Sequence, residues 1–260
     1  KFQRDPELWK EYSEAIESYE REGYAEVVPP HELVGQPGRV FYLMHHHVRH
    51  PRKKKIRIVF NASAKYRGIS LNDCIQSCPD LLESVVGILI RFRVGPIAVA
   101  ADIRAFFSQV WIAPEDRDLN RYLWYVDQSL TELKVLRMIA HGFGGVASQA
   151  CSVHARDRSV SDAVERGEVE QEVAAKAEKM FYSDDLLGSF FSMESARILI
   201  QTITAALKKD GFDLTKIKSN NRGLQELLGG EQTDDRVEVM SHEAALGVTW
   251  HLSTDEICYG

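Results

Sequence analysis

The sequence predicts an α+β fold, in which helices and antiparallel strands occur in clusters rather than in regular alternation. Several long segments repeat apolar side chains at helical spacing, and several short apolar runs of strand type are bounded by Gly or Pro. Of the 260 residues, 44% are apolar and 27% are charged, which is typical of a globular protein. No apolar run approaches the roughly 20 residues that span a bilayer, so we expect no membrane partner.

The first predicted element is an amphipathic helix over residues 5–22. Asp5 can cap its first turn, and Pro6 suits the first helical position because that position needs no backbone N–H. Gly23 is typical of a helix end, and a connector punctuated by Pro and Gly follows it.

The second predicted element is a hairpin with a charged tip. Two β-rich runs, 40–43 and 56–60, flank the basic stretch 45–55. Between residues 39 and 67 there are nine Lys or Arg and no acid, although the whole chain carries a net charge of −6. Such a one-sided block is either a solvated loop or a surface that binds phosphates.

The same two patterns predict the elements that follow. Residues 97–103 form a continuous apolar run that contains Asp102 near its end, and residues 180–191 form an apolar hairpin. The amphipathic stretch 195–209 is a helix that stops at Gly211. Further helices are expected at 81–92, 148–166 and 168–179, and further strands at 119–126, 133–140, 212–217 and 245–250.

Three carboxylates stand out: Asp102, Asp184 and Asp185 each lie in an apolar, strand-like environment. A carboxylate there must be paired, hydrogen-bonded or metal-bound, because burying an isolated charge is costly. Three carboxylates at one sheet edge suit hard divalent cations such as Mg²⁺, and two such ions can promote an in-line displacement at phosphorus. The alternative is a pair of turn acids and an unrelated acid at a strand end.

Several ordered motifs resemble reverse transcriptases of BEL/Pao-type LTR retrotransposons. FYSDD at 181–185 resembles their Tyr-x-Asp-Asp motif, and ADIRAFFSQV at 101–110 resembles their first aspartate motif. Further similar segments are RDPEL at 4–8, GYAE at 23–26, KIRIVFNASAK at 55–65, SLNDC at 70–74, VGILIRFR at 86–93, GFDLTKIKSN at 211–220 and LGVTW at 246–250.

The resemblance implies the fingers and palm of a right-hand polymerase. The N-terminal helix and the fingers would occupy residues 1–95, and the palm residues 96–260, with fingers elements returning at about 115–145. The palm would be an antiparallel sheet packed on helices. The chain stops just after the segment that resembles the primer grip, so we expect the thumb to be absent and do not expect processive synthesis by this piece alone.

The resemblance also implies an RNA-directed DNA polymerase, a nucleotidyltransferase that adds deoxynucleotides to a primer 3′-OH. Asp102, Asp184 and Asp185 would be the catalytic carboxylates and, with the backbone carbonyl of Ile103, would hold two Mg²⁺ or Mn²⁺ ions. The residues implied at the incoming nucleotide are Arg57, Lys55, Phe107, Phe143, Gly144 and Lys216. Those implied at the template or primer are Lys53, Lys54, Asn61, Tyr182, Ser183, Leu246 and Gly247.

Some of these roles have a structural alternative. Phe107 is implied as the aromatic that screens out a ribose 2′-hydroxyl, and the alternative is a core residue beside Phe106. Lys216 is implied as the lysine that protonates the departing pyrophosphate, with Lys218 as its competitor. The three histidines at 45–47 are expected in a loop on the template side, because consecutive histidines point in different directions and no second cluster supplies further zinc ligands.

The implied partners are an RNA template, a DNA primer and deoxynucleoside triphosphates, with protease, ribonuclease H and integrase as flanking domains of a polyprotein. The implied location is a cytoplasmic virus-like particle whose products enter the nucleus. Four cysteines are too few for a disulfide framework, which agrees with a reducing compartment. Departures from the family pattern, such as Asn61 in place of Asp, leave an alternative: a decayed or domesticated remnant that binds nucleic acid without catalysis.

Overall fold

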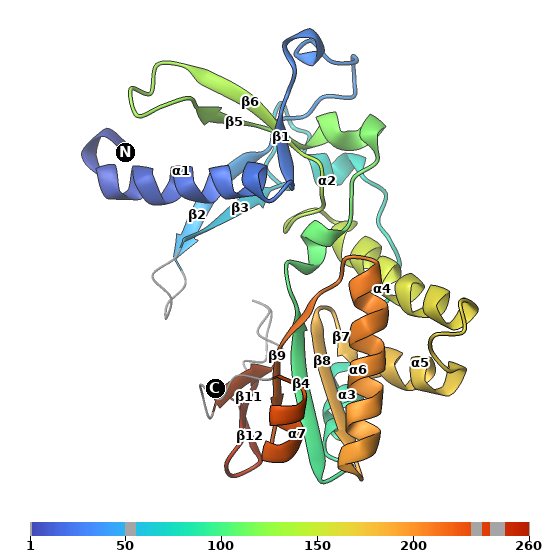
Figure 1. Cartoon of the computed structure of the whole chain (residues 1–260). Helices are drawn as coiled ribbons and strands as arrows, with labels where there is room; N and C mark the ends of the chain where they lie inside the picture. Colours follow the sequence, from blue (N-terminus) through green and yellow to red (C-terminus); the bar gives the residue numbers. More distant parts are fainter. Residues whose placement is uncertain (1, 50–55, 230–235, 240–247, 260) are drawn as a thin grey trace. The chain divides into compact units, whose positions relative to one another are not determined.

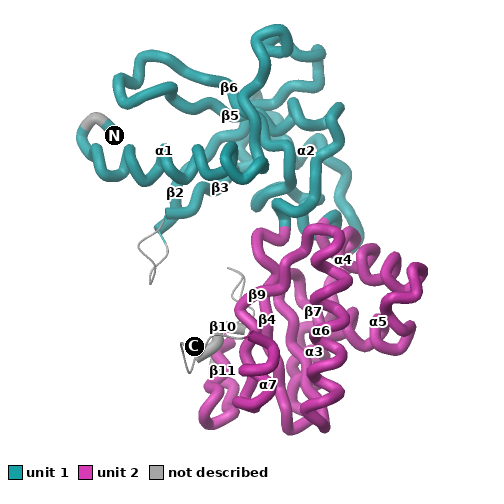
Figure 2. The backbone as a smooth tube through the Cα atoms, in the orientation of Figure 1, with its two compact units in different colours: residues 1–79, 107–151 teal, residues 80–106, 152–260 magenta. Residues whose placement is uncertain are grey.

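The computed structural model describes residues 2–49, 56–229, 236–239 and 248–259. The chain divides into two compact units, shown in two colours in Figure 2. The first unit contains residues 1–79 and 107–151, and the second contains residues 80–106 and 152–260. The predicted fingers at 1–95, with fingers elements returning at about 115–145, and the predicted palm at 96–260 stay a prediction. In the division by contacts, residues 80–95 group with the second unit and residues 107–151 with the first.

The first unit combines a long helix with a small three-stranded sheet and a hairpin (Figure 1). The sheet has the order β1-β6-β5 with antiparallel neighbours, and β2 pairs with β3 as an antiparallel hairpin. The elements are α1 (Pro6–Arg21), β1 (Ala25–Val27), β2 (Met44–Arg49), β3 (Ile56–Asn61), α2 (Leu71–Cys74), β5 (Arg121–Tyr125) and β6 (Leu133–Met138).

An aromatic core holds α1 against this sheet. The backbone N–H of Leu8 donates to the Asp5 carboxylate at 2.9 Å, so the helix begins where the sequence predicts. From the buried face of the helix, Trp9 and Tyr12 stack on Trp124 of β5 with ring centroids 5.2 and 4.6 Å apart. Stacked aromatic rings add to the stabilisation that burial of their apolar area provides.

The predicted strand at 40–43 and the predicted loop for the three histidines are both wrong. Residues 40–43 pair with Arg121 through a single parallel bridge at Tyr42, and the strand begins at Met44, so the histidines lie inside β2. Alternation turns His45 inward, where its Nδ1 lies 2.6 Å from the hydroxyl of Tyr12. Burial lowers the pKa of His45, which suits a neutral ring that packs among aromatic side chains.

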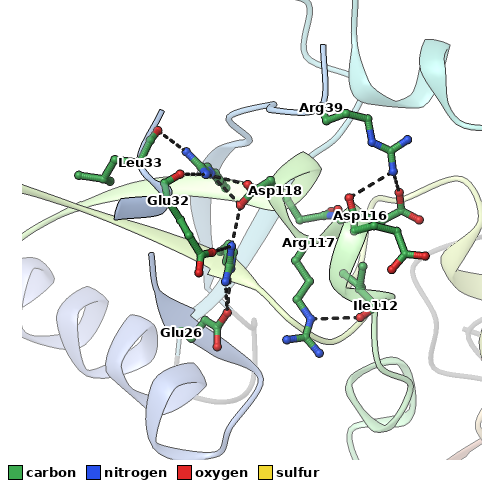
Figure 3. A network of polar contacts seen from close by, with 12 residues as sticks. Glu26, Glu32, Leu33, Arg39, Ile112, Asp116, Arg117 and Asp118 are labelled. Atoms are coloured by element: carbon green, nitrogen blue, oxygen red, sulfur yellow. Dashed lines mark hydrogen bonds and ion pairs between the residues drawn. The ribbon is translucent and has the colours of Figure 1, made fainter. Parts of the chain in front are cut away.

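A buried polar network links β1, β5, β6 and the turns around them (Figure 3). Arg121, which is fully buried, donates to both carboxylate oxygens of Asp118 at 3.0 and 2.8 Å and to the backbone carbonyls of Glu32 and Leu33. Arg137 bonds Asp118 at 2.9 Å and also pairs with the carboxylate of Glu32. Although burial acts in the opposite direction, the hydrogen bonds from the two guanidinium groups lower the pKa of Asp118.

The second unit is built on a four-stranded antiparallel sheet with the order β7-β8-β4-β9 (Figure 1). A smaller antiparallel sheet has the order β10-β11-β12. The elements are α3 (Val85–Phe92), β4 (Ile97–Ile103), α5 (Gln171–Glu178), β7 (Phe181–Tyr182), β8 (Asp185–Phe190), α6 (Met193–Lys209), β9 (Leu214–Ser219), α7 (Arg222–Leu227), β10 (Arg236–Val239), β11 (Val248–His251) and β12 (Glu256–Tyr259). Helix α4 (Ser148–Glu165) starts at the end of the first unit and continues through the second.

The two central strands of this sheet are buried along most of their length, which explains their continuous apolar sequence. Ala98 and Ala100 of β4 and Leu187 of β8 share one core with Phe92 of α3 and Trp250 of β11. The rings of Phe92 and Trp250 meet edge to face at 5.0 Å. Helix α6 packs on the same sheet through its apolar stripe and covers β4, β8 and β9.

Most predicted elements are confirmed, with shifted ends. The helix predicted over 81–92 begins at Val85, because the hydroxyl of Ser84 caps it by accepting from the N–H of Gly87. The prediction missed the short elements β1, α2, α7, β10 and β12. The mixed α and β class with antiparallel sheets is confirmed. Within the described residues, no helix is long and apolar enough to cross a membrane.

Candidate active site

Two of the three predicted carboxylates face each other across neighbouring strands of the second unit. Asp102 of β4 lies directly opposite Asp185 of β8 in the antiparallel register. Directly opposite side chains lie on the same face of a sheet with their Cβ atoms about 4.5–5.5 Å apart. Asp185 is 7% exposed and Asp102 is half-buried, so their repulsion is poorly screened by water.

The third carboxylate belongs to the tight turn between β7 and β8. Tyr182 pairs with Asp185, so Ser183 and Asp184 are the two residues of the hairpin turn. The backbone carbonyl of Asp184 accepts from the N–H of Ile103 at 2.9 Å, which ties the turn to the end of β4. The prediction that both acids lie at the hairpin tip is therefore right for Asp184, whereas Asp185 is the first residue of β8.

A bulge in β9 brings a lysine to the same place. Asp102 pairs with Thr215 and Ala100 with Lys218, so two residues of β9 oppose one residue of β4. Within the bulge Lys216 has a φ of 52°, and its Nζ lies 3.0 Å from Oδ2 of Asp102. The bulge thus directs Lys216 at the carboxylates, while Lys218 lies further along the strand.

The donor set fits a hard divalent cation. Asp102, Asp184 and Asp185 offer carboxylate oxygens, which Mg²⁺ prefers over nitrogen or sulfur ligands. In the described ranges, no three His, Cys, Asp or Glu side chains already form a metal-binding group, and Asp102 is paired with Lys216. Asp102 and Asp185 are therefore neighbours in the sheet, but in the described residues the three carboxylates do not converge on one point.

Two further predicted site residues, Phe107 and Phe143, belong to the first unit. Phe107 is 8% exposed and meets Phe143 edge to face with ring centroids 4.7 Å apart. The ring of Phe143 is largely exposed, so Phe107 is a packed residue with one exposed aromatic neighbour. This environment is compatible with both interpretations of Phe107 that the sequence allows.

Gly144 has a structural reason to be glycine. Its φ is +100°, and a Cβ atom there would lie 2.4 Å from the backbone carbonyl oxygen of Phe60. Asn72 holds the loop further: its Nδ2 donates to the carbonyl of Gly144, and its Oδ1 accepts from the N–H of Val146. Close approach of β3 therefore explains this glycine without reference to a nucleotide.

The basic hairpin is described only in part. Arg57 is exposed on β3 opposite Val48, and Asn61 ends β3 with its carboxamide oxygen accepting from the N–H of Ser63. The predicted residues that lie outside the described residues are Lys53, Lys54, Lys55, Leu246 and Gly247.

No protein-family model matches the chain, and no curated protein matches it. One solved structure with a similar fold is a foamy viral protease–reverse transcriptase in complex with double-stranded DNA. The TM-score is 0.61 and the sequence identity is 13%, over 94% of this chain and 34% of that chain. The likeness is one of fold. The chain spans about a third of the length of the viral chain.

One residue near the carboxylates was not predicted from the sequence: Arg156 of α4, which bonds the turn between β7 and β8. Its guanidinium donates to the backbone carbonyl of Ser183 at 2.6 Å. A signal for it was present, because the buried residues Val153 and Val160 flank Arg156 at helical spacing. An arginine on the apolar face of a helix must have buried partners, because burying an unpaired charge is costly. Its position therefore indicates a specific structural role.

Proposed function

We propose that this chain is the fingers and palm of an RNA-directed DNA polymerase. The observation that carries the proposal is the placement of Asp102 directly opposite Asp185, with Asp184 in the turn between β7 and β8. The similar fold of a viral reverse transcriptase, over nearly all of this chain, supports it. In this interpretation the second unit is the palm, and the first unit supplies the fingers.

The electrostatics of the sheet end favour a bound cation. Like charges directly opposite each other destabilise an antiparallel pair, and here one of them is deeply buried. The Lys216 ammonium offsets part of this repulsion through Asp102. A divalent ion would offset it more fully, because it carries twice the charge and accepts several oxygen ligands.

Asp102, Asp184 and Asp185 would hold two Mg²⁺ or Mn²⁺ ions, with the backbone carbonyl of Ile103 as a further ligand. When bound, such ions lower the pKa of a primer hydroxyl and stabilise charge on the phosphates. The protein contributes by holding its carboxylates in fixed positions through the sheet register and the bond from Ile103 to Asp184.

Lys216 would hold a proton beside the reacting phosphates and deliver it to the departing pyrophosphate. Its position within 3.0 Å of Asp102 supports this role over Lys218. Arg57 on the exposed side of β3 would contact the triphosphate together with Lys55, and Lys53 and Lys54 would contact the template. Phosphate contacts of this kind position a strand without reading its bases.

The test is addition of one deoxynucleotide by this chain to a labelled DNA primer annealed to an RNA template. We expect addition that requires Mg²⁺ or Mn²⁺ and that falls at least roughly a hundredfold in Asp102→Asn, because the variant loses a metal ligand. Asp162→Asn is the matched control, since Asp162 forms an ion pair with the exposed Arg158 in helix α4.

The alternative function is a remnant that binds nucleic acid without catalysis, and the basic stretch at 39–67 favours it equally well. The same assay separates the two. A chain that binds the primer–template with equal affinity with and without divalent metal, and adds no deoxynucleotide, would be the remnant.

A further inference from the structure

The turn that carries Asp184 has little support from its own hairpin. Strand β7 contains only Phe181 and Tyr182, lies at the edge of the sheet, and pairs with β8 through two residue pairs. Ser183 adopts a φ of 54°, a conformation that two-residue turns normally assign to Gly, Asn or Asp. Such a turn keeps one geometry only where its surroundings enforce it.

Arg156 supplies that enforcement from helix α4. Its Nη1 donates to the Ser183 carbonyl at 2.6 Å, and its guanidinium lies 4.7 Å from the ring centroid of Phe181. One side chain therefore contacts both the strand before the turn and the turn itself. On the other side, the N–H of Ile103 holds the carbonyl of Asp184, so the two turn carbonyls are fixed from two different elements.

The guanidinium is itself held in place. Its Nε and Nη2 both donate to one carboxylate oxygen of Asp157, at 2.8 and 2.6 Å. Arg156 is 3% exposed, so these bonds are shielded from water. Burial lowers the pKa of Arg156, and the charges of Asp157, Glu178 and Asp184 act against that effect.

We propose that Arg156 is a positioning residue that fixes the turn at residues 183–184 and so fixes where Asp184 stands relative to Asp102 and Asp185. The inference rests on the proposed function for its catalytic consequence, but its structural content does not. A planar guanidinium can bond a carbonyl on one edge and a carboxylate on another while stacking on a ring, which the single ammonium of lysine cannot do.

Hydrogen exchange tests the positioning directly in the full chain. The Ile103 amide is the reporter because it donates to Asp184, and the Val99 amide in the middle of β4 is the internal reference. In Arg156→Met we expect Ile103 to exchange roughly tenfold faster relative to Val99, because the turn opens locally. Arg156→Lys keeps the charge and one donor, so it should restore part of the protection.

Arg158→Met is the matched control, because Arg158 lies on the same helix with an exposed side chain and should leave the exchange ratio unchanged. An unchanged ratio in Arg156→Met would overturn the inference. So would an equal acceleration at Ile103 and Val99, since that result indicates a general loss of stability.

A second experiment measures how Arg156→Met affects the addition of one deoxynucleotide to the primer. We expect Arg156→Met to lower kcat by roughly tenfold or more while leaving KM for the deoxynucleotide unchanged, because misplacing a catalytic group slows the chemical step. A raised KM with an unchanged kcat would contradict positioning. If the wild-type chain adds no nucleotide, the proposed function fails, and the exchange ratio still decides the role of Arg156.

Discussion

Asp102 and Asp185 form a repelling pair that the fold maintains. Their register is fixed by the apolar residues that precede Asp102 on β4 and follow Asp185 on β8, so the strands cannot slip without exposing the core. Lys216 lies against one member of the pair. At the residue scale, the fold holds two carboxylates in an unfavourable position opposite each other, and such placements of charge are common at functional sites.

One variant, Phe107→Ala, tests whether Phe107 is a core residue only or also selects deoxynucleotides over ribonucleotides. Because the side chain is buried, Phe107→Ala should lower the free energy of unfolding by about 3 kcal/mol. If Phe107 also screens the ribose, the variant should incorporate ribonucleotides more readily relative to deoxynucleotides. Competition between the two nucleotides on one primer–template measures this, with Phe191→Ala, an exposed ring, as control. Unchanged selection would make Phe107 a core residue only.

Asp118 should make the first unit sensitive to acid. Its pKa lies below the usual value near 3.9, so its stabilising effect is complete above about pH 4 and disappears as the pH falls through the lowered pKa. Asp118→Asn should lower the free energy of unfolding by roughly 3 kcal/mol at pH 7, because Arg121 is left buried with an unpaired charge.

Denaturant unfolding at pH 7 and pH 3 checks this prediction. The wild type should lose more stability in acid than Asp118→Asn does. Asp116→Asn removes an exposed ion pair with Arg39 in the same network and should change stability by less than about 1 kcal/mol. An equal loss of unfolding free energy between pH 7 and pH 3 in all three proteins would contradict this role of Asp118.

At the scale of elements, the sequence predicts strands better than it predicts turns and bulges. The strand at 97–103 was predicted with its observed bounds because its apolar run is continuous. The bulge at Lys216 has no sequence signal of its own: it arises from pairing with β4, so the sequence could not choose between Lys216 and Lys218. The start of strand β2 was predicted wrongly because three consecutive polar histidines are typical of a loop. The strand is stabilised by packing of His45 against aromatic side chains such as Tyr122, which the local sequence does not show.

The loop at Gly144 offers a test at this scale. Gly144→Ala should lower the free energy of unfolding by about 2 kcal/mol, because the new methyl group meets the backbone of Phe60 and the φ is positive. Gly142→Ala is the control, since a Cβ at Gly142 has nothing within 4 Å. Thermal unfolding of both variants measures the difference. Equal midpoints would show that the loop can move away from β3.

At the scale of the whole molecule, the sequence predicts the fold class and singles out Asp102, Asp184 and Asp185. The structure shows how these residues lie relative to one another in the sheet and its turn. Asp102 and Asp185 are far apart in the chain, and only the register of β4 with β8 makes them neighbours. The helical spacing marks Arg156 as buried, but its bond to the turn before Asp185 comes only from the packing of α4 on the hairpin. Long-range pairing of this kind depends on tertiary packing rather than on local propensity.

The central claim is that Asp102, Asp184 and Asp185 together bind divalent metal, and titration of Mn²⁺ followed by electron paramagnetic resonance tests it most directly. We expect the chain to bind Mn²⁺ in the presence of a deoxynucleoside triphosphate, with at least roughly tenfold weaker binding in Asp102→Asn and unchanged binding in Asp162→Asn. Equal Mn²⁺ affinity in all three proteins would contradict the account.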